Sequence, residues 1–315
     1  MTDLVCVVPN PSIDRTAEVD RLEPGRIHRP ADVVAVPGGK GLNVARAARS
    51  IGLDTAAALL LAGHAGRWIA EELDGIGLAH RDVWVAGETR TCLSVLDRST
   101  GLLTEVYEPG PTVLTGEWAD YLAAVADVAA RAGPVSLIAL SGSLPPGVFE
   151  DGAAAIVRSA QEVGGRCIVD TSGAPLAAAL PAQPFLVKVN ATEASTVLGH
   201  PIETEAEATR AARQIVERGA RGAVITRGAA GAVAWDGAVA WAVDSPAGAG
   251  PHTVGAGDAF LAGLAAGLVA GDPFEGSLRL AAAVAAASTL LPGPGNVDTA
   301  AIDDLFEGTA VRRLG

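Results

Sequence analysis

The stretch Gly133-Pro-Val-Ser-Leu-Ile-Ala-Leu-Ser-Gly-Ser-Leu-Pro-Pro-Gly147 contains a run of mostly apolar residues, Val135–Leu140, between two turn-forming segments. Hydrophobicity that continues along a strand, instead of alternating, indicates a strand buried on both faces. Similar short runs occur at Leu4–Val8, Cys167–Val169, Phe185–Val187 and Ala223–Ile225. The stretch therefore predicts one strand of a sheet that lies between two layers of helices.

Helical stretches separate these runs. Leu42, Ala45, Ala48 and Ile51 recur every three residues and are followed by Gly52, which is the pattern of a helix that ends at a glycine. Two further stretches are predicted to be helical, Ala119–Ala132 and Glu205–Arg218. Because strands and helices alternate, we expect an α/β fold of three layers, with a mostly parallel central sheet and helices on both faces.

Two segments break this alternation. Thr16–Val36 has mixed polarity and a Pro24-Gly25 turn signal, and Thr89–Tyr107 reads as a β-hairpin around Ser99-Thr100-Gly101. We expect them to form a small β lid from about residues 12–36 and 87–110. No linker or repeat divides the chain, so residues 1–315 are predicted to be a single domain that carries this lid.

The composition excludes several classes of protein. A formal net charge of −13 does not suit a nucleic-acid binder or a membrane-surface protein, both of which rely on Lys and Arg. The three cysteines, Cys6, Cys92 and Cys167, have neither disulfide-framework nor metal-ligand spacing. The start of the chain lacks a basic signal-peptide region, and no apolar run approaches the roughly 20 residues of a membrane span. We therefore expect a cytoplasmic protein.

The segment Thr253-Val-Gly-Ala-Gly-Asp-Ala-Phe260 precedes a helical pattern, which puts Gly255, Ala256 and Gly257 at a helix N-terminus. Unpaired N–H groups and the positive end of the helix dipole make such a position an anion site. Asp258 is then in the first turn, where a carboxylate can take the proton of an attacking hydroxyl during phosphoryl transfer. An ordinary turn at a helix start explains the same spacing.

Four other stretches are candidates for the walls of a site: Pro37–Ala45, Ser141–Gly147, Lys188–Glu193 and Thr226–Gly231. The first offers glycine backbone and Lys40, but it is no P-loop, since Gly41 stands where Ser or Thr must follow the lysine. The second follows a buried strand, where sites of α/β sheets gather. In the third, Asn190 and Glu193 suit either a hydrated Mg²⁺ or a helix cap. The fourth is a turn or a nucleotide-phosphate loop.

Together and in this order, these stretches resemble the ribokinase-like (PfkB) carbohydrate kinase family from Asn10 to about Gly295. Two signatures carry the resemblance, Gly38-Gly-Lys-Gly-Leu-Asn43 and Gly255-Ala-Gly-Asp258. The chain is most similar to the sugar-phosphate branch, which includes 1-phosphofructokinase and tagatose-6-phosphate kinase. The markers of that branch are Asn10-Pro-Ser-Ile-Asp14, Thr89-Arg90, Glu108-Pro-Gly-Pro111, Ser141-Gly-Ser-Leu-Pro-Pro146 and Lys188-x-Asn190-x-x-Glu193. The resemblance implies a ribokinase-like fold and ATP-dependent phosphoryl transfer.

The resemblance also implies residue roles. Asp258 is expected to be the catalytic base, and the backbone of Gly255, Ala256 and Gly257 the anion hole. The sugar is expected on Asp14, Gly38, Gly39 and Asn43, and its own phosphate on Lys40, Arg90 and Arg29, since an always-charged guanidinium fork suits a phosphate. ATP is expected on Lys188, Thr226, Arg227, Gly228 and Gly231, with Mg²⁺ near Asn190 and Glu193.

The expected acceptor is a phosphorylated ketohexose, with fructose 1-phosphate favoured. Tagatose 6-phosphate, fructose 6-phosphate, and an unphosphorylated sugar or nucleoside remain alternatives. In a different class, a catalytically silent sugar-binding regulatory protein would keep the same fold, although the full set of motif residues argues against it. An exposed lid sheet is compatible with a homodimer.

Three positions depart from the family pattern. Cys92 stands where the branch often has Asn, and a thiol cannot replace the paired donors of an amide. His252 replaces the Ser or Asp that usually precedes the Thr253–Asp258 run, a region linked to K⁺ in the wider family. Val189 stands where the family usually has Pro, and we expect this change to matter little.

Overall fold

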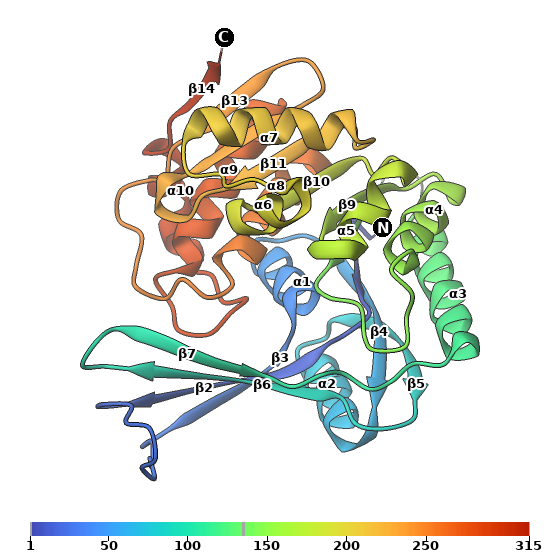
Figure 1. Ribbon diagram of the computed structural model, residues 1–315, viewed down its shortest axis with the longest axis vertical. Helices are drawn as coiled ribbons and strands as arrows, with labels where there is room; N and C mark the ends of the chain where they lie inside the picture. Colours follow the sequence, from blue (N-terminus) through green and yellow to red (C-terminus); the bar gives the residue numbers. More distant parts are fainter. Residues whose placement is uncertain (1, 134–135, 315) are drawn as a thin grey trace.

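The computed structural model describes residues 2–133 and 136–314 (Figure 1). Within these residues the strands form a sheet of ten strands and a separate sheet of four. The order of the larger sheet is β14 (Val311–Leu314), β13 (Ala240–Val243), β12 (Ala232–Trp235), β11 (Ala223–Thr226), β10 (Leu186–Asn190), β9 (Arg166–Asp170), β8 (Leu137–Ser141), β1 (Leu4–Val8), β4 (Thr55–Ala62) and β5 (Ala79–Val85).

Neighbouring strands from β5 to β11 are parallel, whereas β11, β12, β13 and β14 pair with one another antiparallel. The expectation of a mostly parallel sheet is confirmed, and the antiparallel end is a feature that the sequence did not indicate. The predicted strand at Val135–Leu140 corresponds to β8, although Pro134 and Val135 lie outside the described residues.

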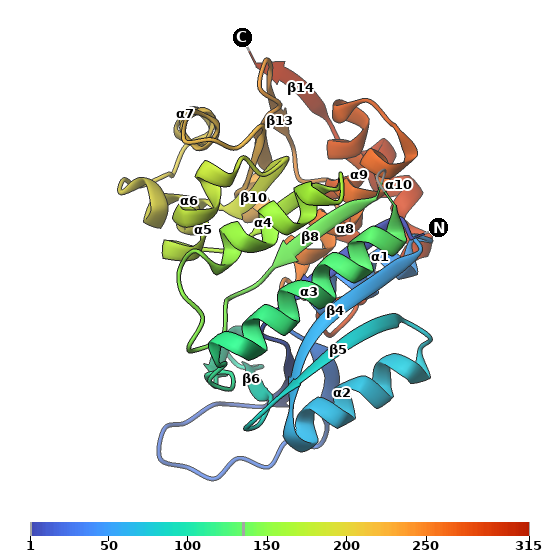
Figure 2. The ribbon, with the colours of Figure 1, turned by 90° about the vertical axis from the view of Figure 1, so that its right-hand side faces the viewer.

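Helices cover both faces of the large sheet (Figures 1 and 2). The side chains of strand β1 are apolar on both faces of the sheet, and each face therefore needs a cover of helices. Leu4, Cys6 and Val8 enter one core, and Val5 and Val7 enter the other. The first core includes α1 (Lys40–Ser50), α2 (Gly63–Gly75), α8 (Ala256–Ala270), α9 (Phe274–Ser288) and α10 (Ile302–Glu307). The second includes α3 (Thr115–Ala132), α4 (Gly152–Glu162), α5 (Gly173–Ala179), α6 (Ala191–Leu198) and α7 (Glu205–Glu217). Short 3₁₀ turns lie at η1 (Leu180–Ala182), η2 (Gly228–Ala230) and η3 (Thr299–Ala301).

The smaller sheet projects from the body of the molecule (Figure 1). Its strands are β3 (Val33–Gly38), β2 (Ser12–Val19), β6 (Arg90–Asp97) and β7 (Leu102–Tyr107), in that order. The expected hairpin is confirmed, since β6 and β7 pair antiparallel. In the register of this sheet Ser12 lies beside both Gly38 and Arg90, so three strands meet in one row where the sheet joins the body.

The cysteines Cys6, Cys92 and Cys167 are buried free thiols, as their spacing suggests. Among residues 2–133 and 136–314, no helix is both long and apolar enough to span a bilayer.

Candidate active site

A cavity of about 810 Å³ runs between the two sheets. One end is lined by residues of the small sheet, among them Ser12, Asp14 and Arg90. The middle is lined by α8, the ends of β9 and β10, and the start of α6. The other end is lined by the loop after β11 and by α9. A volume of this size is in the range of small-molecule sites, and its position at the carboxyl ends of parallel strands is the usual one for α/β sheets.

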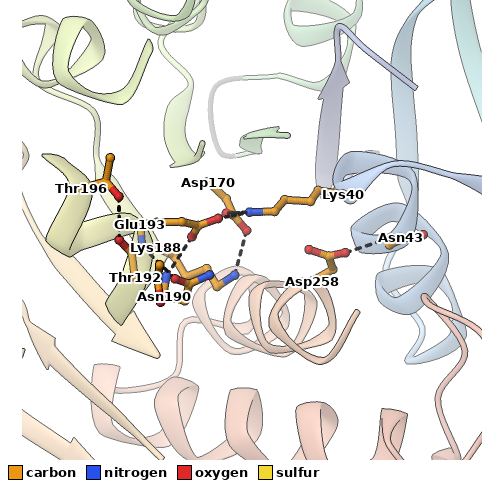
Figure 3. Close-up of polar contacts among 9 residues, drawn as sticks. All are labelled: Lys40, Asn43, Asp170, Lys188, Asn190, Thr192, Glu193, Thr196 and Asp258. Carbon is orange, nitrogen blue, oxygen red and sulfur yellow. Dashed lines mark hydrogen bonds and ion pairs between the residues drawn. The ribbon is translucent and has the colours of Figure 1, made fainter. Parts of the chain in front are cut away.

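Asp258 lies in the first turn of α8, as its position after the glycines predicts, and is 5% exposed. Nδ2 of Asn43 donates a hydrogen bond to its Oδ2 at 3.0 Å (Figure 3). Burial, followed by the negative charge of Asp170, raises the pKa of Asp258 from 3.8 to about 7. A carboxyl with a pKa near neutrality is suited to take up a proton during catalysis.

The glycines before Asp258 form a cradle at the N-terminus of α8. Gly255 is the N-cap and has a φ of 82°, a left-handed conformation that favours glycine. A Cβ on Gly257 would lie 3.0 Å from Nζ of Lys188, so the missing side chain leaves room between the helix end and a lysine ammonium. Helix N–H groups and an ammonium together are the donors that a phosphate prefers, and the residues present therefore fit the phosphates of a nucleotide.

Two lysines meet above this cradle on one buried carboxylate (Figure 3). Nζ of Lys40 lies 3.1 Å from Oδ1 of Asp170 and 2.6 Å from Oε1 of Glu193, and Nζ of Lys188 lies 2.8 Å from Oδ2 of Asp170. Burial opposes ionisation of Asp170, but Lys188 and Lys40 hold its pKa below the ordinary value. Burial likewise opposes the charge of Lys40, yet Asp170 and Glu193 raise its pKa. The centre of the cavity is thus a fixed network of charges.

Asn190 and Glu193 are present as a capping box at the start of α6. Oδ1 of Asn190 accepts a hydrogen bond from the Glu193 N–H at 2.8 Å, and Oε2 of Glu193 accepts from the Asn190 N–H at 2.9 Å. Among the described residues there is no group of three or more His, Cys, Asp or Glu placed to hold a metal. Mg²⁺ needs no such cage, because it binds through one or two carboxylates, waters and substrate phosphates. Glu193, whose side chain is 16% exposed, therefore fits a hydrated ion.

The small-sheet end of the cavity is built for a polar ligand. Asp14 accepts hydrogen bonds from the Ser12 hydroxyl at 2.6 Å and the Gly39 N–H at 3.2 Å, and burial raises its pKa. Oδ1 of Asn43 is buried without a hydrogen-bond partner in the described part of the chain. Arg90 donates to the carbonyl oxygen of Asn10 at 3.1 Å, which holds the guanidinium at the cavity wall. A carboxylate in the cavity wall suits a ligand that carries hydroxyl groups.

The cavity gathers most of the predicted site residues. Those in its wall are Asp14, Gly39, Lys40, Asn43, Arg90, Lys188, Asn190, Glu193, Thr226, Gly228, Gly231, Gly255, Ala256, Gly257 and Asp258. Gly38 is one position away, and a Cβ there would overlap the Asp14 carboxyl, 2.1 Å from its Cγ. Arg227 follows β11 and points to the carbonyl of Ala230. Arg29 is exposed in the segment between β2 and β3 and is not in the wall.

Sequence reasoning missed Asp170, the centre of the charge network, together with the cavity residues Ser12, Tyr107 and Thr171. A usable signal existed for Asp170, since an acidic residue directly follows the predicted buried strand Cys167–Val169. Lys40 was expected on the sugar phosphate, whereas its ammonium lies against Asp170 and Glu193.

Residues 2–300 match the model of the pfkB family carbohydrate kinases. The chain belongs to this family. It is 40% identical over 282 residues to a 1-phosphofructokinase of Xanthomonas campestris pv. campestris, a match that covers 84% of each protein. The chain is therefore an ATP-dependent carbohydrate kinase, an activity that requires ATP and a divalent metal ion.

Solved structures agree with this assignment. Phosphofructokinase-2 of Escherichia coli, crystallised with potassium, superposes with a TM-score of 0.88 at 27% identity, covering 98% of this chain and 99% of that one. A Thermotoga maritima protein named as a possible 1-phosphofructokinase superposes with a TM-score of 0.89 at 26% identity, covering 99% and 100%. The expected ribokinase-like α/β fold is confirmed.

Proposed function

We propose that this kinase transfers the γ-phosphoryl group of ATP to a hydroxyl of fructose 1-phosphate. The observation that carries the proposal is the single cavity that joins Asp14 and Arg90 at one end to Thr226 and Gly228 at the other, with Asp258 between them. The 40% identity to a protein named 1-phosphofructokinase supports fructose 1-phosphate over other ketohexose phosphates.

In this proposal the acceptor hydroxyl faces Asp258, which takes its proton as the oxygen attacks the γ-phosphorus and ADP leaves. Asn43 orients the carboxylate. The N–H groups of Gly255, Ala256 and Gly257 and the ammonium of Lys188 stabilise the charge that develops on the transferred group. Mg²⁺, held near Asn190 and Glu193, would neutralise charge on the phosphate oxygens when bound.

Recognition of the acceptor is assigned to the small sheet and α1. Asp14, Gly38, Gly39 and Asn43 hold sugar hydroxyls, and the guanidinium of Arg90 binds the phosphate already on the sugar. Lys40 lines the cavity as part of the charge network, and in this proposal its ammonium also binds the sugar phosphate. On the donor side, Thr226, Arg227, Gly228 and Gly231 support the nucleotide.

We further propose that residues 1–315 act as one kinase domain in the cytoplasm, and that the sheet of residues 12–36 and 87–110 closes over the cavity to exclude water. Exposed apolar side chains of this sheet, Val34, Leu102 and Val106, would give a homodimer its contact. A structure named as the tetrameric inhibited form of the E. coli relative supports oligomer formation, and its potassium complex supports K⁺ as a second cation.

The test is ADP release with Mg-ATP and a panel of acceptors: fructose 1-phosphate, fructose 6-phosphate, tagatose 6-phosphate, fructose, ribose and adenosine. We expect turnover on phosphorylated ketohexoses, with the highest kcat/KM for fructose 1-phosphate. Turnover confined to a neutral acceptor would contradict the roles of Arg90 and Lys40. Absence of turnover on every acceptor, with sugar still bound, would favour a silent sugar-binding protein. The same assay with and without K⁺ tests the second cation, and light scattering after gel filtration tests the dimer.

A further inference from the structure

A further cavity, of about 390 Å³, lies between α1, the end of α2 and the segment 291–297. It shares no lining residue with the active-site cavity, and its volume is in the range of small-molecule sites. Two arginines of α1, Arg46 and Arg49, line it together with apolar side chains, among them Ile76 and Leu291. None of its described lining residues is acidic. The cavity therefore combines positive charge with apolar surface.

The guanidinium of Arg46 is oriented by neutral groups and is not neutralised by a carboxylate. Its Nη1 donates to the carbonyl oxygen of Pro294 at 3.0 Å, and its Nη2 donates to Oδ1 of Asn296 at 2.8 Å. In the part of the chain that the structure describes, neither Arg46 nor Arg49 forms an ion pair. Burying a charge without a counter-ion costs free energy, and an anion bound in the cavity would offset this cost.

Both arginines keep donors for a ligand. A guanidinium has five N–H donors in a planar fork, which fits a phosphate or a carboxylate at two points. The hydrogen bonds of Arg46 use its two terminal nitrogens, and its Nε–H has no partner among the described residues. Arg49 donates to the carbonyl oxygen of Gly77 through Nη1. Since Arg46 and Arg49 are three positions apart, they lie on the same face of α1.

The wall of this cavity also packs against the active site. A Cβ on Gly295 would lie 3.2 Å from Cα of Asn43, the residue whose amide orients the catalytic carboxylate (Figure 3). A Cβ on Gly255, the N-cap of α8, would lie 2.7 Å from Cβ of Pro294. The segment 291–297 therefore touches both the anion cradle and the helix that holds the base.

Charge links the cavity to the sugar end of the active site. Burial lowers the pKa of Arg46, and the negative charge of Asp14 opposes this change. Because the attraction is mutual, the Arg46 guanidinium favours the ionised Asp14 carboxylate, which accepts hydrogen bonds from sugar hydroxyls in the proposed function. An anion that neutralises Arg46 would therefore weaken Asp14 as an acceptor.

We propose that this cavity is an inhibitory effector site for a small organic phosphate that carries an apolar group. The phosphate binds to Arg46 and Arg49, and the apolar group packs on Ile76 and Leu291, which are 45% and 37% exposed. Binding raises KM for the acceptor sugar. The inference goes beyond the proposed function, and its kinetic test alone rests on fructose 1-phosphate as the acceptor.

The probe is phenyl phosphate, which joins a dianion to an apolar ring. Calorimetry with saturating Mg-ADP and fructose 1-phosphate compares the wild type with Arg49→Ala and with Arg158→Ala, a control at an exposed position of α4 outside both cavities. We expect the dissociation constant to rise about 10–100-fold in Arg49→Ala, the effect of one lost charged hydrogen bond, and to stay unchanged in Arg158→Ala. Equal affinity in all three proteins, or no binding to the wild type, would overturn the proposal.

A second variant tests the charge of the cavity without removing an arginine. Ile76→Glu places a carboxylate at an exposed position of the cavity wall, and it should weaken the binding of phenyl phosphate. Phe149→Glu, at an exposed apolar position outside this wall, is the control and should bind like the wild type. Wild-type affinity in an Ile76→Glu protein that melts normally would contradict the proposed site.

Steady-state kinetics at saturating Mg-ATP test the inhibition. Phenyl phosphate should raise KM for fructose 1-phosphate at least about fivefold, the lower end of usual coupling between two sites, and should not do so in Arg49→Ala. Benzyl alcohol, which is neutral, should have no effect. Inhibition that persists in Arg49→Ala would mean that the probe acts at the active site, and it would overturn the proposal. Binding that depends on Arg49 but leaves KM unchanged would overturn the effector role.

This inference and the proposed function fail separately. Binding that depends on Arg49, without turnover on any acceptor, would support the site and contradict the proposed function. Turnover on fructose 1-phosphate without such binding would support the proposed function and overturn the effector site.

Discussion

Nδ2 of Asn43, from α1, lies 3.0 Å from Oδ2 of Asp258, from α8, so the first turns of two helices that are distant in sequence hold one carboxylate between them. The hydrogen bond favours the charged carboxylate, and it opposes the rise in pKa that burial and Asp170 cause. Asn43 therefore sets both the direction of the Asp258 side chain and the pH at which it loses its proton.

Replacing Asn43 by Ala removes this bond, and the pKa of Asp258 then rises further. We expect the acid limb of the kcat profile, near pH 7 in the wild type, to move to higher pH. The measurement is kcat between pH 5.5 and 9 at saturating substrates. A role in sugar binding alone would raise KM and leave the limb where it is, which would contradict the link to the base.

Replacing Asp258 by Asn should abolish turnover while Mg-ATP still binds, because the base is lost and the anion cradle is kept. The variant should also gain stability at high pH. Below about pH 4 the wild-type carboxyl is protonated in both folded and unfolded chains. Between about pH 4 and 7 only the folded state keeps the proton, so the contribution of this group to stability falls as pH rises through its folded pKa.

Above pH 7 the wild type therefore bears the full cost of a buried charge, which is up to about 4 kcal/mol for a shift of this size. Asp258→Asn should melt at a higher temperature than the wild type at pH 8, and the difference should shrink at pH 5. Loss of ATP binding together with turnover would mean that Asp258 holds the fold of the cradle and does not act as the base.

Replacing Asp170 by Asn breaks a buried network that two lysines share, and such losses cost about 3–5 kcal/mol. We expect a clearly lower melting temperature and, since the charge of Asp170 raises the pKa of Asp258, a shift of the acid limb to lower pH. Asp127→Asn, which removes an exposed partner of Arg131, is the control and should leave the melting temperature nearly unchanged. Equal melting temperatures for the two variants would argue against the network as a stabilising element.

Replacing Arg90 by Ala should raise KM for the sugar phosphate about 10–100-fold, the effect of one lost charged hydrogen bond, with KM for ATP unchanged. Arg15→Ala removes the same charge from the exposed position of the neighbouring strand β2 and serves as the control. An equal effect of both changes would indicate general electrostatics instead of a phosphate contact.

Replacing Gly38 by Ala should raise KM for the acceptor, since the new Cβ would occupy the position of the Asp14 carboxyl. Gly116→Ala, where a Cβ would meet nothing within 4 Å, is the matched control. Steady-state kinetics with fructose 1-phosphate distinguish the two. Unchanged KM in Gly38→Ala would mean that Asp14 does not hold the sugar.

The sequence predicts β1, β8, β9, β10 and β11, because each contains a short apolar run that its own residues define. It did not indicate the other parallel strands, β4 and β5, and β5 carries His80, Arg81 and Asp82 among its apolar residues. The antiparallel end was not predicted, since β12, β13 and β14 are only four residues each, and β14 pairs with β13 although α8, α9 and α10 separate them in the chain. Their pairing is decided by neighbours that a local pattern does not contain.

The same limit applies to the site. Asp258 was identifiable because glycine, aspartate and helix pattern are adjacent in the chain. The contact between Lys40 and Asp170 joins residues 130 positions apart, so their pairing was not visible in the sequence. Local chemistry could be read from the sequence, whereas contacts between distant segments required the structure.

Ser12, Gly38 and Arg90 lie side by side in one row, at the boundary between the small sheet and the body of the molecule. The two parts have different functions in the enzyme. Residues that would choose the acceptor are carried largely by the small sheet, and the cradle, the base and the charge network belong to the large body. Substitutions in the small sheet can thus change which sugar is used while the phosphoryl-transfer machinery stays intact. Kinases with different acceptors can therefore arise from this fold through changes confined to the small sheet.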